Sequence, residues 1–277
     1  MAMQKKFGQN FLINSAARER IVSALELSPG DNVWEVGPGL GCMSDLILRS
    51  GAKLTVFEID RGFSGALHDF FSDYEKSGAL RIVQGDVLKN WEAELMRSGG
   101  SGSCIKLFGN LPYNIAASFI ADTISSGTVF SRCVFTVQRE VAERMAARAG
   151  SRDYSAFSVL CQRFYDVVLL PVLGAGNFWP RPNVASQTAV LSPRGKDAAG
   201  LSAVETKMFA RTVHALFSSR RKTVANNIKS VLPEGADAEE ILVKSGIDPG
   251  CRAESLCADD FSVLSLNLSS ATMGMST

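Results

Sequence analysis

The chain has 277 residues, of which 46% are hydrophobic and 21% are charged, so it can bury a sizeable core and is neither disordered nor collagen-like. Its formal net charge of +1 excludes a uniformly basic nucleic-acid binder but allows a local basic surface. The longest apolar run, Val167–Leu173, contains Pro171 and is far shorter than the roughly 20 residues of a membrane span. Because the N-terminus has no apolar run of the signal-peptide kind, we expect a cytoplasmic protein without a membrane partner.

Cysteines and histidines give no metal pattern. The chain has six cysteines, none of them in a CxxC pair, and the closest two, Cys251 and Cys257, fit neither a zinc knuckle nor a redox dithiol. His68 and His214 have no other ligands at metal-binding spacing. We therefore expect reduced, mostly buried thiols and no metal site.

The predicted elements alternate between strand and helix through the first two thirds of the chain. Short β-branched or aromatic segments bounded by Gly, Asp or Asn predict buried strands at Asn32–Val36, Leu54–Ile59, Leu80–Gln84, Cys104–Phe108 and Cys133–Val137. Helices are predicted at Cys42–Ser50 and Phe63–Tyr74, and further strands, which would form a closing hairpin, at Asp166–Leu173 and Gln187–Leu191. This alternation indicates an α/β fold, a parallel sheet with helices on both faces.

The composition changes near Ser192. Residues 192–200, SPRGKDAAG, are typical of a linker. The pattern after it is helical, with helices predicted at Val204–Phe217, Lys222–Val231, Ala238–Ser245 and Ala258–Leu268. We therefore expect an α/β domain over residues 1–195 and a small α-helical domain over residues 201–277.

A glycine turn follows the first predicted strand. In Gly37-Pro-Gly39-Leu-Gly41, the glycines allow a sharp turn and close approach of a ligand, and the helix after it offers free N–H groups. Glu58 ends the next strand, where a carboxylate can accept hydrogen bonds from both ribose hydroxyls of a nucleoside. Together these features predict a nucleoside-containing cofactor.

The identity of that cofactor stays open on these residues alone. The dinucleotide fingerprint needs a small residue at position 42, where this chain has Cys42. Glu35, just before the turn, suits enzymes that use S-adenosylmethionine (SAM). Asp86, at the end of the third strand, can reach the adenine amine of bound SAM or can simply cap a helix.

The segment Asn110-Leu-Pro-Tyr113 follows the fourth predicted strand, at the edge of the sheet where ligands bind. An exocyclic adenine amine is a poor nucleophile because its lone pair is delocalised into the ring. The Asn110 side-chain oxygen and the Leu111 carbonyl can accept the two N6 hydrogens and direct the lone pair at a methyl group. Tyr113 offers an aromatic face on which a flipped base can stack.

With these motifs in order, the chain resembles the adenine-N6,N6 dimethyltransferases of small-subunit ribosomal RNA, of the KsgA type. The resemblance runs from about Lys5 to Phe261. Further motifs carry it: KFGQNFL (6–12), FWPRPNV (178–184), FSSRRKT (217–223) and GIDP (246–249) with RAE (252–254). On this resemblance the cofactor-binding residues are Asn10, Leu12, Gly37, Glu58, Asp86 and Asn110.

The resemblance implies a Rossmann-like, class I SAM-dependent methyltransferase fold with a seven-stranded mixed sheet. It implies SAM as the cofactor and dimethylation of two adjacent adenosines in the 3′-terminal hairpin of 16S rRNA. The catalytic residues would be Asn110, Leu111 and Tyr113, with Phe178 packing against the target base opposite Tyr113. Asn183 and Ala185 depart from the family's usual lysine and polar residue, so this loop lacks a positive charge and a polar side chain that the family often has there.

The near-neutral total charge conceals a basic stretch. Between Glu205 and Val231 there are six basic residues against one acid, and the densest cluster is Arg220, Arg221 and Lys222, to which Lys5 and Lys6 can add. We expect this cluster to contact rRNA. The expected partner is 16S rRNA within the 30S subunit or its precursor, and we expect the enzyme to be a monomer.

Three other functions compete with this one. The large-subunit rRNA adenine methyltransferases of macrolide resistance share the N-terminal motif and an Asn-x-Pro-Tyr, but the RRKT and GIDP stretches favour the small-subunit type. DNA adenine methylases usually carry Asp-Pro-Pro-Tyr. A ribosome-assembly factor that has lost catalysis is disfavoured by the intact Gly37, Glu58, Asp86, Asn110 and Tyr113.

Overall fold

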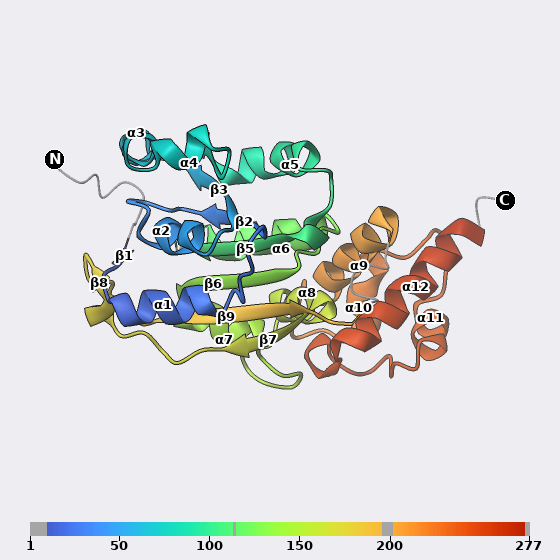
Figure 1. Cartoon of the computed structure of the whole chain (residues 1–277). Helices are drawn as coiled ribbons and strands as arrows, with labels where there is room; N and C mark the ends of the chain where they lie inside the picture. Colours follow the sequence, from blue (N-terminus) through green and yellow to red (C-terminus); the bar gives the residue numbers. More distant parts are fainter. Residues whose placement is uncertain (1–9, 113–114, 196–201, 275–277) are drawn as a thin grey trace. The chain divides into compact units, whose positions relative to one another are not determined.

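A computed structural model describes residues 10–112, 115–195 and 202–274 of the chain (Figure 1). The chain folds as two compact units. The first comprises Met1–Phe119, Val129–Ala142 and Val168–Pro193, and the second comprises Ile120–Thr128, Glu143–Val167 and Arg194–Thr277.

This division differs from the expected domains of residues 1–195 and 201–277. The chain does change unit at Pro193, close to the expected linker, but the second unit also takes two earlier segments. The reason is α8 (Ala156–Phe164), which packs on α9 (Ala203–Leu216) and α12 (Ala258–Gly274). The ring of Phe164 contacts that of Phe209 edge to face, with centroids 6.1 Å apart.

A seven-stranded sheet organises the first unit, with the strand order β4-β3-β2-β5-β6-β9-β7. Its strands are β2 (Asn32–Val36), β3 (Lys53–Glu58), β4 (Leu80–Gln84), β5 (Ile105–Asn110), β6 (Arg132–Gln138), β7 (Tyr165–Leu169) and β9 (Ser186–Pro193). β4, β3, β2, β5 and β6 run parallel, whereas β9 pairs antiparallel with β6. The sheet is therefore mixed. The predicted strands are confirmed, with one change that matters: β5 ends at Asn110, so this residue closes the strand rather than following it.

Helices connect the strands (Figure 1). They are α1 (Ser15–Ser23), α2 (Cys42–Arg49), α3 (Arg61–Phe70), α4 (Ser72–Lys76), α5 (Val87–Arg97), α6 (Ala116–Ser125) and α7 (Arg139–Met145). The predicted helix over 63–74 is divided in two at Phe71. The backbone there leaves the helical region, at φ −117° and ψ 22°, and the ring is buried in the core.

Apolar side chains cover both faces of the sheet, as the alternation of a strand requires. On β2, Val33 belongs to a core cluster with Ile21 of α1 and Ile47 of α2. The next residue, Trp34, packs on the other side against the rings of Phe57 and Phe130. The doubly wound arrangement predicted from the sequence is therefore confirmed.

A second, two-stranded sheet joins distant parts of the first unit. β1 (Phe11–Leu12) pairs antiparallel with β8 (Phe178–Trp179), with Phe11 opposite Trp179 and Leu12 opposite Phe178. Leu12 and Phe178 point into the core, with 6% and 1% of their surface exposed. The last two residues of the N-terminal motif and the first two of the FWPRPNV segment thus lie side by side.

The second unit is helical, as predicted. It contains α8, α9, α10 (Val224–Asn227), α11 (Ala238–Lys244) and α12. The rings of Phe217 and Phe261 stack on each other within this unit. The helix predicted over 222–231 is two shorter turns, α10 and a 3₁₀ turn. Among the described residues, 3₁₀ turns lie at Gly102–Cys104, Ala175–Asn177, Ile228–Ser230 and Ala253–Ser255. In the parts of the chain that the structure covers, no helix has the length and apolar character needed to cross a membrane.

Candidate functional site

Three predicted site residues meet at the carboxyl ends of neighbouring strands. Gly37 follows β2, Glu58 ends β3 and Asn110 ends β5. β2 lies between the other two strands and is parallel to both, so these positions share one edge of the sheet. In an open α/β sheet this is the edge at which ligands bind.

The glycine turn needs its glycines. Gly37, Gly39 and Gly41 all have positive φ, of 72°, 57° and 77°, a conformation that other residues adopt at a cost. A Cβ on Gly39 would lie 2.7 Å from the ring of Phe11, and one on Gly41 would collide with Phe71. The turn is therefore packed closely against β1 on one side and against the end of α3 on the other.

Glu58 holds this turn in place. It is 1% exposed, and its Oε2 accepts a hydrogen bond from the Gly39 N–H at 3.1 Å, while Oε1 accepts one from the Asp60 N–H at 2.8 Å. Burial raises the pKa of this carboxyl above its ordinary value, although the two backbone N–H groups oppose the shift. The residue predicted to bind a ribose thus also shapes the loop beside it.

A second buried carboxyl lies next to the turn. The Ser44 hydroxyl of α2 donates to Glu35 Oε2 at 2.6 Å. Burial raises the pKa of Glu35 to about 7, and the nearby charge of Glu58 adds to the shift. Two buried acids make this loop a poor neighbour for a pyrophosphate and a good one for a cationic ligand.

Glu35→Gln is expected to change how stability depends on pH. Burial raises the pKa of Glu35 from the ordinary 4.5 to about 7 in the folded chain. The folded state therefore holds this proton more tightly, and the free energy of unfolding falls as pH rises from 4.5 through 7. Glutamine does not ionise, so the variant gains on the parent over that interval, by about 3 kcal/mol at most.

Urea unfolding of both chains at about pH 5 and about pH 8 measures this gain. Since the Ser44 hydroxyl donates to an oxygen that glutamine retains, the hydrogen bond itself survives the substitution. An equal difference between the chains at both pH values would contradict the prediction.

Asn110 is tied to the N-terminal segment. Its Nδ2 donates to the Asn10 carbonyl at 2.9 Å, so two residues predicted to bind the cofactor are in direct contact. This bond fixes the amide plane and directs Oδ1 away from Asn10. The following peptide is held as well, because the Leu111 N–H donates to the Thr136 carbonyl of β6 at 3.1 Å. Tyr113 lies outside the described residues.

Asp86 and Leu12 have structural contacts of their own. Asp86 caps α5, where its Oδ1 accepts from the Leu88 N–H at 3.1 Å. The helix-cap alternative for Asp86 is therefore confirmed, and contact with an adenine amine stays a prediction. The Leu12 side chain is buried in the core, so any contact of this residue with a cofactor would come from its backbone.

Phe178 lies differently from what the sequence predicts. We expected its ring to face a target base, but the ring is 1% exposed and packs in the core cluster with Leu12 and Leu173. The pairing of β1 with β8 explains this position, since the residue opposite Leu12 must share its inward face. In this structure Phe178 has no open face for a base.

The predicted RNA-binding cluster in the second unit is not uniform. The guanidinium of Arg220 donates to the carbonyls of Arg152 and Tyr154, and its Nε is 3.8 Å from a carboxylate oxygen of Glu254. Arg220 therefore links segments of this unit to one another. Its neighbours Arg221 and Lys222 are exposed, and no side-chain hydrogen bond or ion pair is recorded for either within the described residues. Lys5 and Lys6 lie outside those residues.

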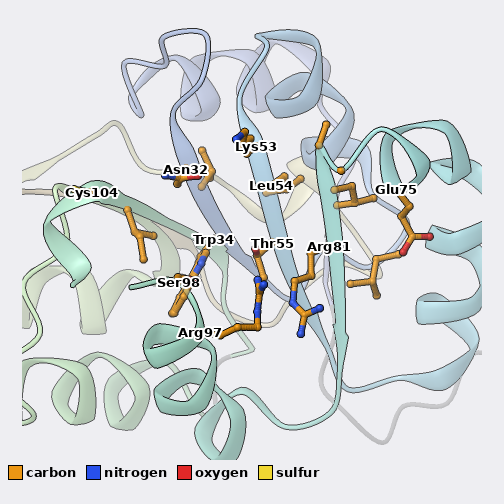
Figure 2. A pocket seen from close by; sticks show the side chains of 16 residues that line it. Asn32, Trp34, Lys53, Leu54, Thr55, Glu75, Arg81, Arg97, Ser98 and Cys104 are labelled. Carbon is orange, nitrogen blue, oxygen red and sulfur yellow. The ribbon is translucent and has the colours of Figure 1, made fainter. Parts of the chain in front are cut away.

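A cavity of about 470 Å³ lies at the opposite end of the sheet (Figure 2). It is lined by Asn32, Lys53, Leu80 and Ile105, the first residues of β2 to β5. Arg81 and Arg97, which also line it, are both paired with Glu94. Because it adjoins the amino ends of the strands, this cavity is separate from the site formed by Gly37, Glu58 and Asn110.

Sequence reasoning missed Phe11 and Ser44. The Phe11 ring contacts the glycine turn and also meets Phe63 edge to face, with centroids 5.5 Å apart. Ser44 is fully buried and is the hydrogen-bond partner of Glu35. The sequence did offer a signal that Ser44 is buried, because it lies on the same side of α2 as the apolar residues Met43 and Ile47. Within the described residues, no three or more His, Cys, Asp or Glu side chains are grouped so that they could bind a metal ion.

Residues 1–268 match the family described as ribosomal RNA adenine dimethylase. A ribosomal RNA small subunit methyltransferase A from Treponema denticola is 47% identical over 95% of this chain and 89% of its own. The protein of that name from Borreliella burgdorferi is 34% identical over 97% of this chain and 89% of its own.

Two solved structures have a similar fold. A dimethyladenosine transferase from Plasmodium falciparum has a TM-score of 0.76 at 22% identity, covering 94% of this chain and 98% of that one. The 23S rRNA methyltransferase ErmE has a TM-score of 0.67 at 20% identity, covering 94% of this chain and 100% of that one. The expected Rossmann-like methyltransferase fold is thereby confirmed.

Proposed function

This chain belongs to the ribosomal RNA adenine dimethylase family, and on that premise we propose that it dimethylates the N6 amines of two adjacent adenosines in the 3′-terminal hairpin of 16S rRNA. The observation that carries the proposal within the molecule is the contact between Asn110 and Asn10 beside the glycine turn. The small-subunit assignment rests on the relatives that are 34% and 47% identical. The reaction would take place in the cytoplasm, on the 30S subunit or its precursor.

SAM fits the residues at this edge of the sheet. Glu58 would accept hydrogen bonds from the ribose, Asp86 would contact the adenine amine, and the tight turn at Gly37–Gly41 would approach the cofactor through its backbone. The buried carboxyls of Glu35 and Glu58 favour a ligand with a positive charge over one with a pyrophosphate. When bound, SAM supplies an activated methyl group on a sulfonium.

The Asn110 amide suits an exocyclic amine as its target. Its Nδ2 is occupied by the Asn10 carbonyl, which leaves Oδ1 as the acceptor for an N6 hydrogen. The Leu111 carbonyl would accept the other hydrogen, and the N–H of the same residue is held by the Thr136 carbonyl. These acceptors would stabilise the positive charge that develops on N6 when its lone pair takes the methyl group that SAM supplies. The amine would then release a proton to solvent, so no strong general base is needed.

The test is a methylation assay. Purified chain is incubated with labelled SAM and undermethylated 30S subunits, and the labelled bases are mapped by primer extension. We expect label on two adjacent adenosines of the 16S 3′ hairpin and none on 50S subunits treated in the same way. Label on 23S rRNA, or SAM-independent binding without transfer, would refute the proposal.

Glu58→Ala is expected to lower SAM affinity tenfold or more. The variant loses two charge-assisted hydrogen bonds to the ribose, each of which contributes roughly 1.5–3 kcal/mol. Calorimetric titration with SAM measures the loss. Because Glu58 also accepts from the Gly39 and Asp60 N–H groups, Glu58→Gln, which keeps one carbonyl oxygen, serves as the comparison. An unchanged affinity in a folded Glu58→Ala variant would contradict the ribose assignment.

Replacing Arg221 and Lys222 together with alanine is expected to weaken the salt dependence of 30S binding. Both side chains are exposed, and each phosphate contact contributes about 0.7–0.9 to the slope of log affinity against log salt. The slope should therefore fall by about 1.4–1.8, while SAM affinity stays constant. Filter binding at several salt concentrations measures the slope, and an unaltered slope would remove this cluster from the RNA surface. Arg220→Ala is a poorer probe, since it also breaks contacts to Arg152 and Tyr154.

A further inference from the structure

The two-stranded sheet of β1 and β8 has one face turned toward the core of the first unit and one face turned outward. Residues that lie opposite each other in an antiparallel pair share a face, and successive residues alternate. Leu12 and Phe178 form the inward pair and are buried in the core. Phe11 and Trp179 form the outward pair, and Trp179 is 54% exposed.

An exposed tryptophan is an exception in this chain. The other two tryptophans, Trp34 and Trp91, are 2% and 3% exposed. Leaving a large indole in water forgoes the free energy of burying its apolar surface, about 25 cal/mol per Å². Tryptophan also stacks well on nucleobases, so its exposed position points to a ligand.

The indole is placed beside the proposed methyl-transfer site. Its cross-strand neighbour Phe11 contacts the glycine turn at Gly39 and the ring of Phe63 at the start of α3. Phe11 follows Asn10, whose carbonyl accepts from Asn110. The outward face of the ladder thus adjoins the residues that we assign to the cofactor and to the target amine.

The support of the indole is well anchored. Next to the ladder, the Ile13 N–H donates to the Asn177 carbonyl at 2.8 Å. The Asn14 side chain donates to that of Asn177 at 3.0 Å and also caps α1. A surface that is already ordered loses little conformational entropy when it binds a ligand.

A positively charged residue lies close to Trp179 in the sequence. Arg181 is two residues after Trp179 and is exposed, and no ion pair is recorded for it within the described residues. An aromatic face for a base together with a guanidinium for its phosphate is the pairing by which proteins hold unpaired nucleotides.

We propose that Trp179 stacks on an unpaired RNA base that neighbours the target adenosine, and that Arg181 binds the backbone phosphate of that nucleotide. This inference rests on the proposed function, because it takes rRNA as the substrate. It assigns to Trp179 a role in positioning the substrate. The neighbouring Phe178 cannot take this role here, because its ring is buried. The same face would reject a fully paired helix, whose bases offer no free surface for stacking.

Binding of undermethylated 30S subunits by Trp179→Ala tests the stacking contact. We expect a loss of roughly 5- to 150-fold in affinity, the range for one stacked base, while Trp179→Phe keeps most of the affinity. Phe70→Ala is the matched control, since Phe70 is a 68% exposed aromatic residue of the same unit at the end of α3. SAM affinity by calorimetry should be the same in all of these variants. Arg181→Ala should lower the salt slope by about 0.7.

Fluorescence gives a readout that a purely structural role would not move. Because the other two tryptophans are buried, a short oligoadenylate RNA should quench the fluorescence of Trp179 in the parent chain. This quenching should be absent in Trp179→Phe. Equal 30S affinity of Trp179→Ala and Phe70→Ala, or a loss of SAM affinity in Trp179→Ala, would overturn the inference. If the parent methylates 30S subunits and Trp179→Ala binds them normally, only the inference fails. If the parent binds through Trp179 without methylating, only the proposed function fails.

Discussion

Changing Asn110 to alanine should lower methyl transfer about a hundredfold, the usual cost of removing one preorganised polar partner of the transition state. The side-chain oxygen is then no longer available to the target amine. The variant also loses the hydrogen bond to the Asn10 carbonyl, so the N-terminal segment is less firmly placed. Single-turnover transfer of label from SAM to 30S subunits measures the rate, and filter binding should show that 30S affinity survives.

Asn110→Asp separates the two contributions. It keeps an acceptor oxygen for the amine but cannot donate to Asn10. A rate for the aspartate variant well above that of the alanine variant would assign the main effect to the acceptor. Near-normal transfer by Asn110→Ala would refute the catalytic assignment altogether.

Changing Phe178 to alanine should lower the free energy of unfolding by about 3–5 kcal/mol, as large-to-small changes in a packed core do. The ring is 1% exposed and joins β8 to Leu12 of β1 and to Leu173. Urea unfolding measures the effect. Trp179→Ala is the natural control, since it removes an aromatic side chain from the outward face of the same strand and should change stability by well under 1 kcal/mol.

A third variant, Phe178→Leu, tests whether the ring contacts a base. If the ring captured a base, Phe178→Leu would preserve much of the packing and still weaken 30S binding. If it is a core residue only, Phe178→Leu should bind 30S subunits normally and lose only modest stability. Marginal destabilisation by Phe178→Ala would show that the ring is not held in the core.

The sheet was predictable because its strands are short and rich in β-branched and aromatic residues, and the central ones, such as β2 and β6, are almost wholly buried. Asn32–Val36 and Leu80–Gln84 were predicted with the bounds they have in the structure, and Gly37, Glu58 and Asn110 were predicted at the edge where they lie. The β1–β8 ladder was not predictable in this way. Each strand has two residues, too few for an alternation pattern, and the partners are distant in sequence.

Long-range contacts explain why Phe178 and Arg220 lie differently from what the sequence suggests. A motif places Phe178 near the site, but only its pairing with Leu12 decides which way the ring points. Arg220 belongs to a run of charges that is typical of a solvated surface. The carbonyls that it binds, at Arg152 and Tyr154, come from a segment that we had expected in the other domain. Local sequence carries no record of such partners.

The interleaved path of the chain has a consequence during synthesis. α8 belongs to the second unit, yet the ribosome makes it before the last strand of the first unit, β9, and well before α9 and α12. At about 5–20 residues per second, its apolar side, including Phe164, awaits the Phe209 ring for several seconds. The second unit therefore cannot complete its fold until segments on both sides of β9 have been made. A chain truncated after β9 would leave that apolar side uncovered, and a chain that begins at Arg194 would lack α8.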